Sequence, residues 1–214
     1  MTLKSVIVAG AALEVYPASL IQFITSTPEI LTHFGLRASY FKALNVNSQV
    51  GDHPDAKMPT TWREIEYDIT ARAVVFGAQV KASAGLLNSR LFVDTAKVPG
   101  LESELPSVTA MTIRVGGDLD IEIIDDFSIS AGASFDKPYS MGRLTKRFFP
   151  KASGWGYDFR AGVSYALLSH LDVLVFARYG VVNYKLNPAS DSTYTATKAV
   201  DSLFGVNGGL RAYW

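Results

Sequence analysis

The chain has 214 residues, enough for one domain of ordinary size. Its 20 basic and 20 acidic residues cancel to a net charge of zero, which argues against a nucleic-acid partner because such a partner needs a basic surface. It contains no cysteine, which excludes disulfides, thiolate catalysis and cysteine-ligated metals. No run of about 20 mostly apolar residues is present, so a membrane-spanning form would have to be a closed β-barrel.

Two interpretations stay open for the first residues. Lys4 followed by residues 5–13 resembles a short secretory signal peptide, but Glu14 follows at once and no small-x-small cleavage site lies at a suitable distance. The alternative is a first β-strand over about 3–15. A second strand is expected over 33–47.

Period-two alternation is clearest over residues 62–75 and 111–123. In each segment an apolar face alternates with a face that carries acidic side chains. A helix cannot give this pattern, because its 100° step would scatter the charges around the circumference. The same alternation predicts strands over 127–135 and 155–167.

Three less regular strands are expected over 79–93, 171–186 and 199–214. The alternation shifts near Leu87 in the first and near Val182 in the second. A β-bulge or an exit from a membrane would explain such a shift.

The connections between these strands alternate in length. Short turns fall near 76–78, 124–126 and 169–170, and long polar loops fall near 48–61, 94–107, 138–154 and 187–198. Outer-membrane barrels combine short turns at one end with longer loops at the other, and their tilted strands need roughly 9–11 residues. The pattern predicts an all-β fold, an antiparallel up-and-down transmembrane β-barrel of 8–10 strands that forms a single domain over residues 1–214.

The cost of a charge in lipid predicts which face of each strand lies inside. Arg or Lys facing mid-bilayer costs roughly 2–4 kcal/mol, so the charged rows are expected to fill the lumen. The predicted ion network in the lumen consists of Arg37, Glu64, Glu66, Asp68, Arg72, Arg114, Asp118, Asp120, Glu122, Asp158, Arg160, Arg178 and Arg211. Aromatic residues near strand ends suit two interfacial girdles. These are Trp62, Phe127, Phe135, Trp155 and Trp214. A soluble lipocalin-like barrel, apolar inside and charged outside, is the inverted alternative.

The final residues, 204–214, alternate between an apolar face and a face of polar residues and glycine. This strand resembles the closing strand of bacterial outer-membrane β-barrels, which ends on an aromatic residue, usually Phe, that the barrel-assembly machinery reads. The small Ala212 departs from that pattern. The resemblance implies an outer-membrane location, with outer-membrane lipid and the assembly machinery as partners. The implied assembly signal consists of Phe204, Val206, Leu210, Tyr213 and Trp214.

Strand parity raises a question about the start of the chain. Nine strands are predicted, whereas single-chain bacterial barrels use even numbers. Eight strands result if residues 1–29 are peripheral to the barrel, and ten result if another strand lies upstream. The segment 12–17 (Ala-Leu-Glu-Val-Tyr-Pro), together with 34–40, 105–106 and 187–188, resembles outer-membrane barrels of myxobacterial type. That resemblance implies a strand before the Glu-x-Tyr-Pro strand, and so favours ten.

The chemistry-bearing residues give no strong site. The three histidines are His33, His53 and His170. His170 with Asp172 is best interpreted as part of a polar turn. His53, between Asp52 and Asp55, could belong to a weak metal site or to an outer-rim hydrolase, but a solvated loop is the simpler interpretation.

No catalytic residue, metal or cofactor is predicted, and the chain is not expected to be an enzyme. The predicted role is structural: anchoring in the membrane, or interaction through the extracellular loops. A narrow porin-like diffusion channel is the alternative.

Overall fold

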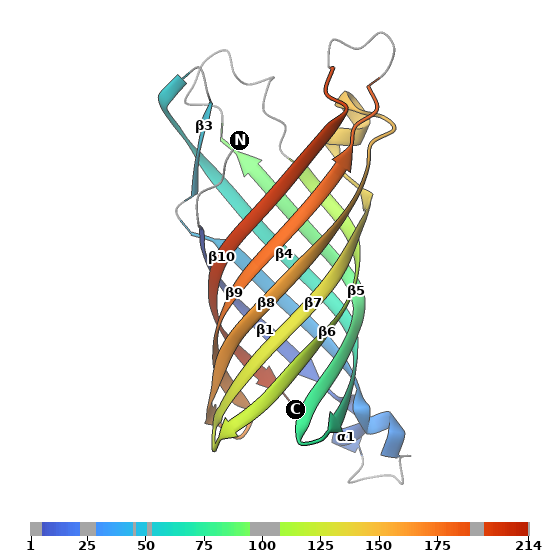
Figure 1. The fold of residues 1–214 in the computed structure, drawn as a ribbon, viewed down its shortest axis with the longest axis vertical. Helices are drawn as coiled ribbons and strands as arrows, with labels where there is room; N and C mark the ends of the chain where they lie inside the picture. Colours follow the sequence, from blue (N-terminus) through green and yellow to red (C-terminus); the bar gives the residue numbers. More distant parts are fainter. Residues whose placement is uncertain are drawn as a thin grey trace.

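The computed structural model describes residues 6–21, 29–44, 46–50, 53–94, 108–188 and 195–213. Nine strands form one closed β-barrel, in which each strand pairs with two neighbours and β2 pairs with β4 to complete the ring (Figure 1). These are the nine strands that the sequence predicts. They are β1 (Val6–Val15), β2 (Phe34–Ala43), β4 (His53–Val75), β5 (Ala78–Val93), β6 (Val108–Ile124), β7 (Phe127–Ser140), β8 (Ser153–Leu168), β9 (Leu171–Lys185) and β10 (Lys198–Tyr213).

The ring is antiparallel except where β1 meets β10. These two strands run parallel, with Ala9 opposite Gly208 and Leu13 opposite Ala212. A ring with an odd number of strands cannot alternate direction all the way round, so one neighbouring pair must be parallel. The described ring has nine strands and not eight, while the expectation of ten, which places another strand upstream of this chain, stays a prediction. Because β1 lies in the ring between β10 and β2, the expectation that residues 1–29 are peripheral is wrong for β1.

Three two-residue turns close one end of the barrel, which we call the lower end (Figure 1). They follow β4, β6 and β8, at the positions that the sequence predicts. Phe76 and Gly77, between β4 and β5, both have positive φ, as in the primed turns that match the twist of paired strands. β10 and β1 both run toward this lower end, and Val6, the first residue of β1, lies opposite Gly205, about midway along β10 (Figure 1).

Additional elements lie at both ends. A short helix α1 (Pro17–Ile21) and a 3₁₀ turn η1 (Glu29–His33) connect β1 to β2 at the lower end. At the upper end, β3 (Val46–Val50) pairs with the start of β4, and a π-helical turn η2 (Leu144–Phe148) follows β7. The expected loops 48–61 and 138–154 thus contain regular structure, while 95–107 lies outside the described residues. No helix in the described ranges has the length and apolarity to cross a membrane.

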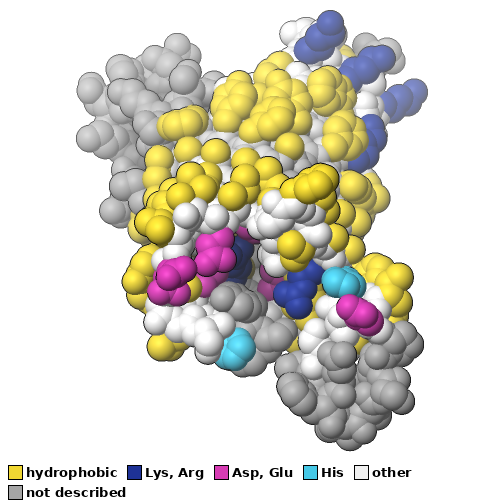
Figure 2. All heavy atoms as spheres, turned by 60° about the horizontal axis from the view of Figure 1, so that its bottom comes forward, with side chains coloured by type: hydrophobic (Ala, Val, Ile, Leu, Met, Phe, Trp, Pro, Cys, Tyr) yellow, Lys and Arg dark blue, Asp and Glu magenta, His cyan; other side chains and the backbone are white. Residues whose placement is uncertain are grey.

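The pleat of the strands separates two faces. Large apolar side chains stand on the outside, among them Tyr67, Val115 and Phe159, each more than half exposed. Figure 2 shows such side chains spread over the face of the barrel in view, with acidic and basic side chains around a depression at the lower end. The inverted, lipocalin-like arrangement is not observed, because buried carboxylates and arginines occupy the inner face.

The alternation near Leu87 and Val182 was expected to shift through a β-bulge or an exit from a membrane, and no bulge is found at either residue. Strand pairing is continuous through both residues. Both residues keep their inward orientation and line a cavity at the upper end of the lumen. The alternation shifts in the sequence because the lumen wall changes from charged to apolar there, and no extra residue is inserted.

Candidate functional site: the charged lumen

Arginines and carboxylates from eight strands converge inside the barrel. Since successive residues of a strand point to opposite faces, every second residue of the charged rows projects inward. The resulting contacts form three layers along the barrel axis, which we describe from the upper end to the lower end.

The upper layer is built around Arg114 and Arg178. The guanidinium of Arg114 donates two hydrogen bonds of 2.8 Å to Asp136 on the adjacent strand, and it lies 3.4 Å from Glu66 of β4, two strands along the wall. Arg178 bridges Asp158 and Glu64. Arg114 is only 3% exposed, so its charge is balanced by these carboxylates and not by water.

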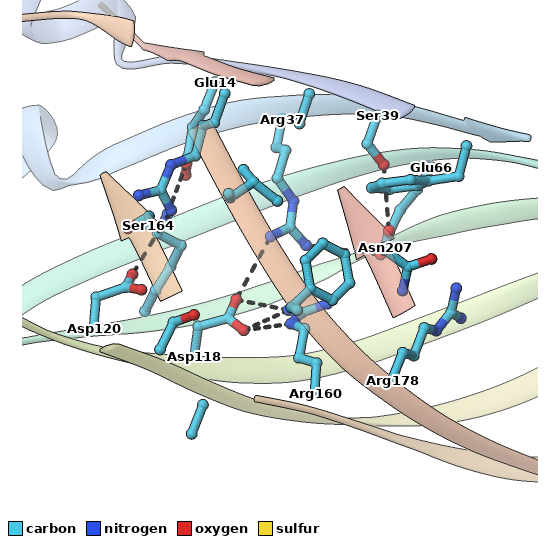
Figure 3. Close-up of a pocket in the computed structure, with 18 of the residues that line it drawn as sticks. Glu14, Arg37, Ser39, Glu66, Asp118, Asp120, Arg160, Ser164, Arg178 and Asn207 are labelled. Atoms are coloured by element: carbon cyan, nitrogen blue, oxygen red, sulfur yellow. Dashed lines mark hydrogen bonds and ion pairs between the residues drawn. The ribbon is translucent and has the colours of Figure 1, made fainter. Parts of the chain in front are cut away.

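The middle layer centres on Asp118 of β6. Arg160 donates from Nε and Nη2 to its two carboxylate oxygens at 2.6 and 2.7 Å. Arg37, from the far wall, reaches Asp118 at 3.5 Å (Figure 3). Arg37 also binds Asp68 at 2.6 Å. Two arginines and two carboxylates from four strands therefore tie opposite walls of the barrel together.

The lower layer closes the lumen near the short turns. Lys81 pairs with Glu14 at 2.6 Å, and Tyr16 donates a 2.8 Å hydrogen bond to the same carboxylate. The guanidinium of Arg72 lies over the Tyr16 ring, 3.5 Å from its centroid. Burial, together with the adjacent Glu14 carboxylate, raises the pKa of Tyr16 to about 12, so the phenol remains a donor at neutral pH. Arg211 pairs with Asp172 beside this group.

The ion pairs leave little free space in the lower half of the lumen. A cavity of about 120 Å³ lies among Arg37, Asp118, Arg160 and Arg211. A larger cavity of about 540 Å³ lies above the upper layer, with Arg114 and Arg178 in its floor and Leu87 and Val182 in its wall. Small barrels are usually filled by their own side chains, and the lower half of this lumen follows that pattern.

Eleven of the thirteen residues of the predicted network take part in these ion pairs. The two others differ: Arg72 stacks on Tyr16, and Glu122 is exposed near the β6–β7 turn. Whether these residues have a role beyond holding the barrel together stays a prediction.

Sequence reasoning missed four residues of the network: Glu14, Lys81, Asp136 and Asp172. Asp172 was assigned to a polar turn, but it is the first inward residue of β9. Asp136 could have been predicted from the alternating row of small inward residues on β7. It is the next inward residue after Ser134. Glu14 and Lys81 are isolated charges, and nothing in either strand alone points to their pairing.

The predicted aromatic girdle is altered at one position. Phe135 and Trp155 point outward and are about half exposed. Trp62 instead faces the upper cavity, where its indole N–H donates to Ser89 Oγ at 3.3 Å. Trp214 lies outside the described residues, as does the side chain of Tyr213; of the predicted assembly signal, Phe204, Val206 and Leu210 stand exposed on the outside of β10.

The histidines do not form a site in the described part of the chain. His33 ends η1 and His170 lies in the β8–β9 turn, while the side chain of His53 falls outside the described residues. No cluster of three potential metal ligands occurs among the residues that the structure describes. The metal and hydrolase hypotheses for His53 therefore remain untested.

Comparisons with known proteins do not assign this chain to a family. No protein-family model matches the chain, and no curated protein matches it. A solved structure of the outer-membrane expressed OmpT of Vibrio cholerae is similar at 19% identity and a TM-score of 0.31, over 85% of this chain and 52% of that chain. The chain thus spans about half the length of that structure.

Proposed function

We propose that this chain is an outer-membrane β-barrel whose lumen is closed by ion pairs, and that it acts as an anchor presenting loops at its upper end. The observation that carries the proposal is the distribution of side chains on the closed ring. Apolar residues stand exposed on the outside, while the charged residues are buried inside. In water this arrangement would expose a large apolar surface, whereas in lipid it satisfies both faces.

The ion network supports a structural role over transport. Its contacts join opposite walls of the lumen and leave only about 120 Å³ in the middle and lower layers. An anchor needs a rigid, closed wall, and buried ion pairs with good geometry provide one. A narrow diffusion channel is the second candidate, supported by the 540 Å³ cavity above the network.

Heat-modifiability tests the membrane assignment directly. The full chain is refolded into detergent micelles and run on a denaturing gel with and without boiling, beside a detergent-free sample. We expect a compact band that shifts on boiling, and only in the sample with detergent. A soluble, monodisperse protein without detergent would overturn the proposal.

A matched pair of substitutions separates a lipid-facing surface from a solvated one. Leu119 points outward from β6 and lies ~13 Å above the β6–β7 turn, near the middle of an apolar band ~25 Å tall. Leu119→Arg should destabilise a lipid-embedded barrel by about 2–4 kcal/mol, measured as a lower urea midpoint in vesicles. Val200→Arg, at an exposed position near the upper end of β10, is the control and should change the midpoint little. Equal effects of the two substitutions would contradict a lipid-facing band.

A further inference from the structure

Three basic side chains lie side by side on the outer face of the barrel. Lys42 of β2 is directly opposite Arg63 of β4, and Arg63 is directly opposite Arg90 of β5. Their inward neighbours, such as Ala43 and Glu64, are buried, which leaves these three on the outside. Adjacent strands lie about 4.8 Å apart, so the three charges form a row about 10 Å long. We call Lys42, Arg63 and Arg90 the basic row.

The three positive charges of the basic row have no carboxylate within the row to balance them. Like charges directly opposite each other in a sheet destabilise it. The ion pairs found among the described residues all lie in the lumen, and none includes a member of the row. The outward positions of β2, of β5 and of residues 63–75 of β4 carry no carboxylate. An anion seated on the row would remove the repulsion.

The height of the basic row matches a membrane interface. Arg63 and Arg90 each lie twelve residues from the nearer end of the β4–β5 turn, because Val75 is opposite Ala78. With a rise of about 3.3 Å per residue and a tilt of about 35–45°, they stand ~28–32 Å above that turn. An apolar band of about 25 Å would end just below them.

The surface under the row is apolar. Tyr40, Tyr67 and Leu86 lie on the same face toward the lower end and are 43–61% exposed. Phe92 lies above the row, and the centre of its ring is 5.9 Å from the guanidinium of Arg90. A cationic row directly above an apolar wall is complementary to a molecule with an anionic head and hydrocarbon tails.

We infer that the basic row binds the phosphate headgroup of a lipid, with the acyl chains lying on the apolar wall below it. This inference rests on the proposed membrane location. Two guanidinium groups and an ammonium can each donate to phosphate oxygens, and such charge-assisted hydrogen bonds are among the stronger ones. Three cations around one site favour a phosphate monoester, which carries nearly two negative charges, over a phosphodiester, which carries one.

Native mass spectrometry of the refolded barrel tests this inference. Phosphatidic acid is titrated into detergent-solubilised protein, with phosphatidylglycerol, phosphatidylcholine and inorganic phosphate as parallel probes. We expect phosphatidic acid to bind most tightly and phosphatidylcholine most weakly, with no effect of inorganic phosphate. Displacement of the lipid by inorganic phosphate would show that the row recognises free phosphate and would overturn lipid binding.

The variant K42Q/R63Q/R90Q should bind phosphatidic acid about tenfold more weakly or worse. The control K137Q/K185Q removes two basic charges elsewhere on β7 and β9 and should bind as the unmodified chain does. Equal binding by all three proteins would overturn the inference. Heat-modifiability of each protein is measured first: a chain that never forms a compact band in detergent refutes the membrane proposal, whereas a folded barrel without preferential binding refutes only the lipid site.

Discussion

At the scale of single residues, the lumen shows how a barrel tolerates buried charge. Arg114 is satisfied because two carboxylates, Asp136 on the neighbouring strand β7 and Glu66 two strands away on β4, meet its guanidinium. A buried pair of this kind adds little net stability over an apolar pair of similar volume, but breaking it leaves an uncompensated charge. The network is therefore best tested by removing one partner and then both.

Arg114→Ala should lower the free energy of unfolding by about 3–5 kcal/mol, because Asp136 and Glu66 lose their closest cation. The double variant R114A/D136A should lose less than the sum of the two single variants, since the second change removes one of the stranded charges. Urea unfolding of the refolded barrel in vesicles, followed by tryptophan fluorescence, measures all three. Strict additivity would show that the two side chains do not interact.

Residue-level patterns predicted most of this network. Alternation placed Asp118 and Arg160 on inward faces, because a period of two fixes the face of every residue once one is known. It could not predict which charges meet, since Arg37 reaches Asp118 across the lumen and that distance depends on barrel closure. Trp62 was assigned to the outer aromatic girdle because it lies near a strand end, although its position in the alternating pattern places it inside, where it lines the upper cavity.

At the scale of strands, the seam between β1 and β10 is the least expected feature. The sequence predicted nine strands and the position of each, a number that conflicts with the even strand counts of single-chain bacterial barrels. It did not predict the parallel contact that resolves this, because pairing between the first and last strands is set by closure and not by any local pattern. Parallel pairing is slightly less stable per residue than antiparallel pairing.

Cysteine cross-linking tests the parallel register, and the absence of native cysteine makes the result unambiguous. Ala11 lies directly opposite Leu210. The variant A11C/L210C should form a disulfide in the refolded barrel, because neighbouring strands bring Cα atoms within the range that a disulfide spans. The control A11C/F204C places the second thiol about 20 Å further along β10 and should stay reduced. Cross-linking of the control, or none in A11C/L210C in a heat-modifiable barrel, would contradict the register.

At the scale of the whole molecule, the barrel divides into a filled lower half and an open upper half. Among the described residues, six basic side chains and nine carboxylates form the ion pairs of the lumen, so carboxylates exceed cations in these pairs. The apolar wall of the upper cavity ends where these pairs begin. If the filled half is the barrier to transport, removing one of its arginines should open a route lined by acidic groups.

Single-channel recording in planar bilayers tests whether the filled half of the lumen blocks the passage of ions. The unmodified barrel should give no discrete conductance steps, because Arg37 and Arg160 meet at Asp118 and block the middle of the lumen. Arg160→Ala should give small steps with a reversal potential that favours cations, since it removes a blocking side chain and leaves Asp118 facing the opening. The control Lys137→Gln, on the outer face of β7, should remain silent. Steady conductance from the unmodified barrel would favour the diffusion-channel function over the anchor, because the ion pairs would then line a route for solutes and would not close it.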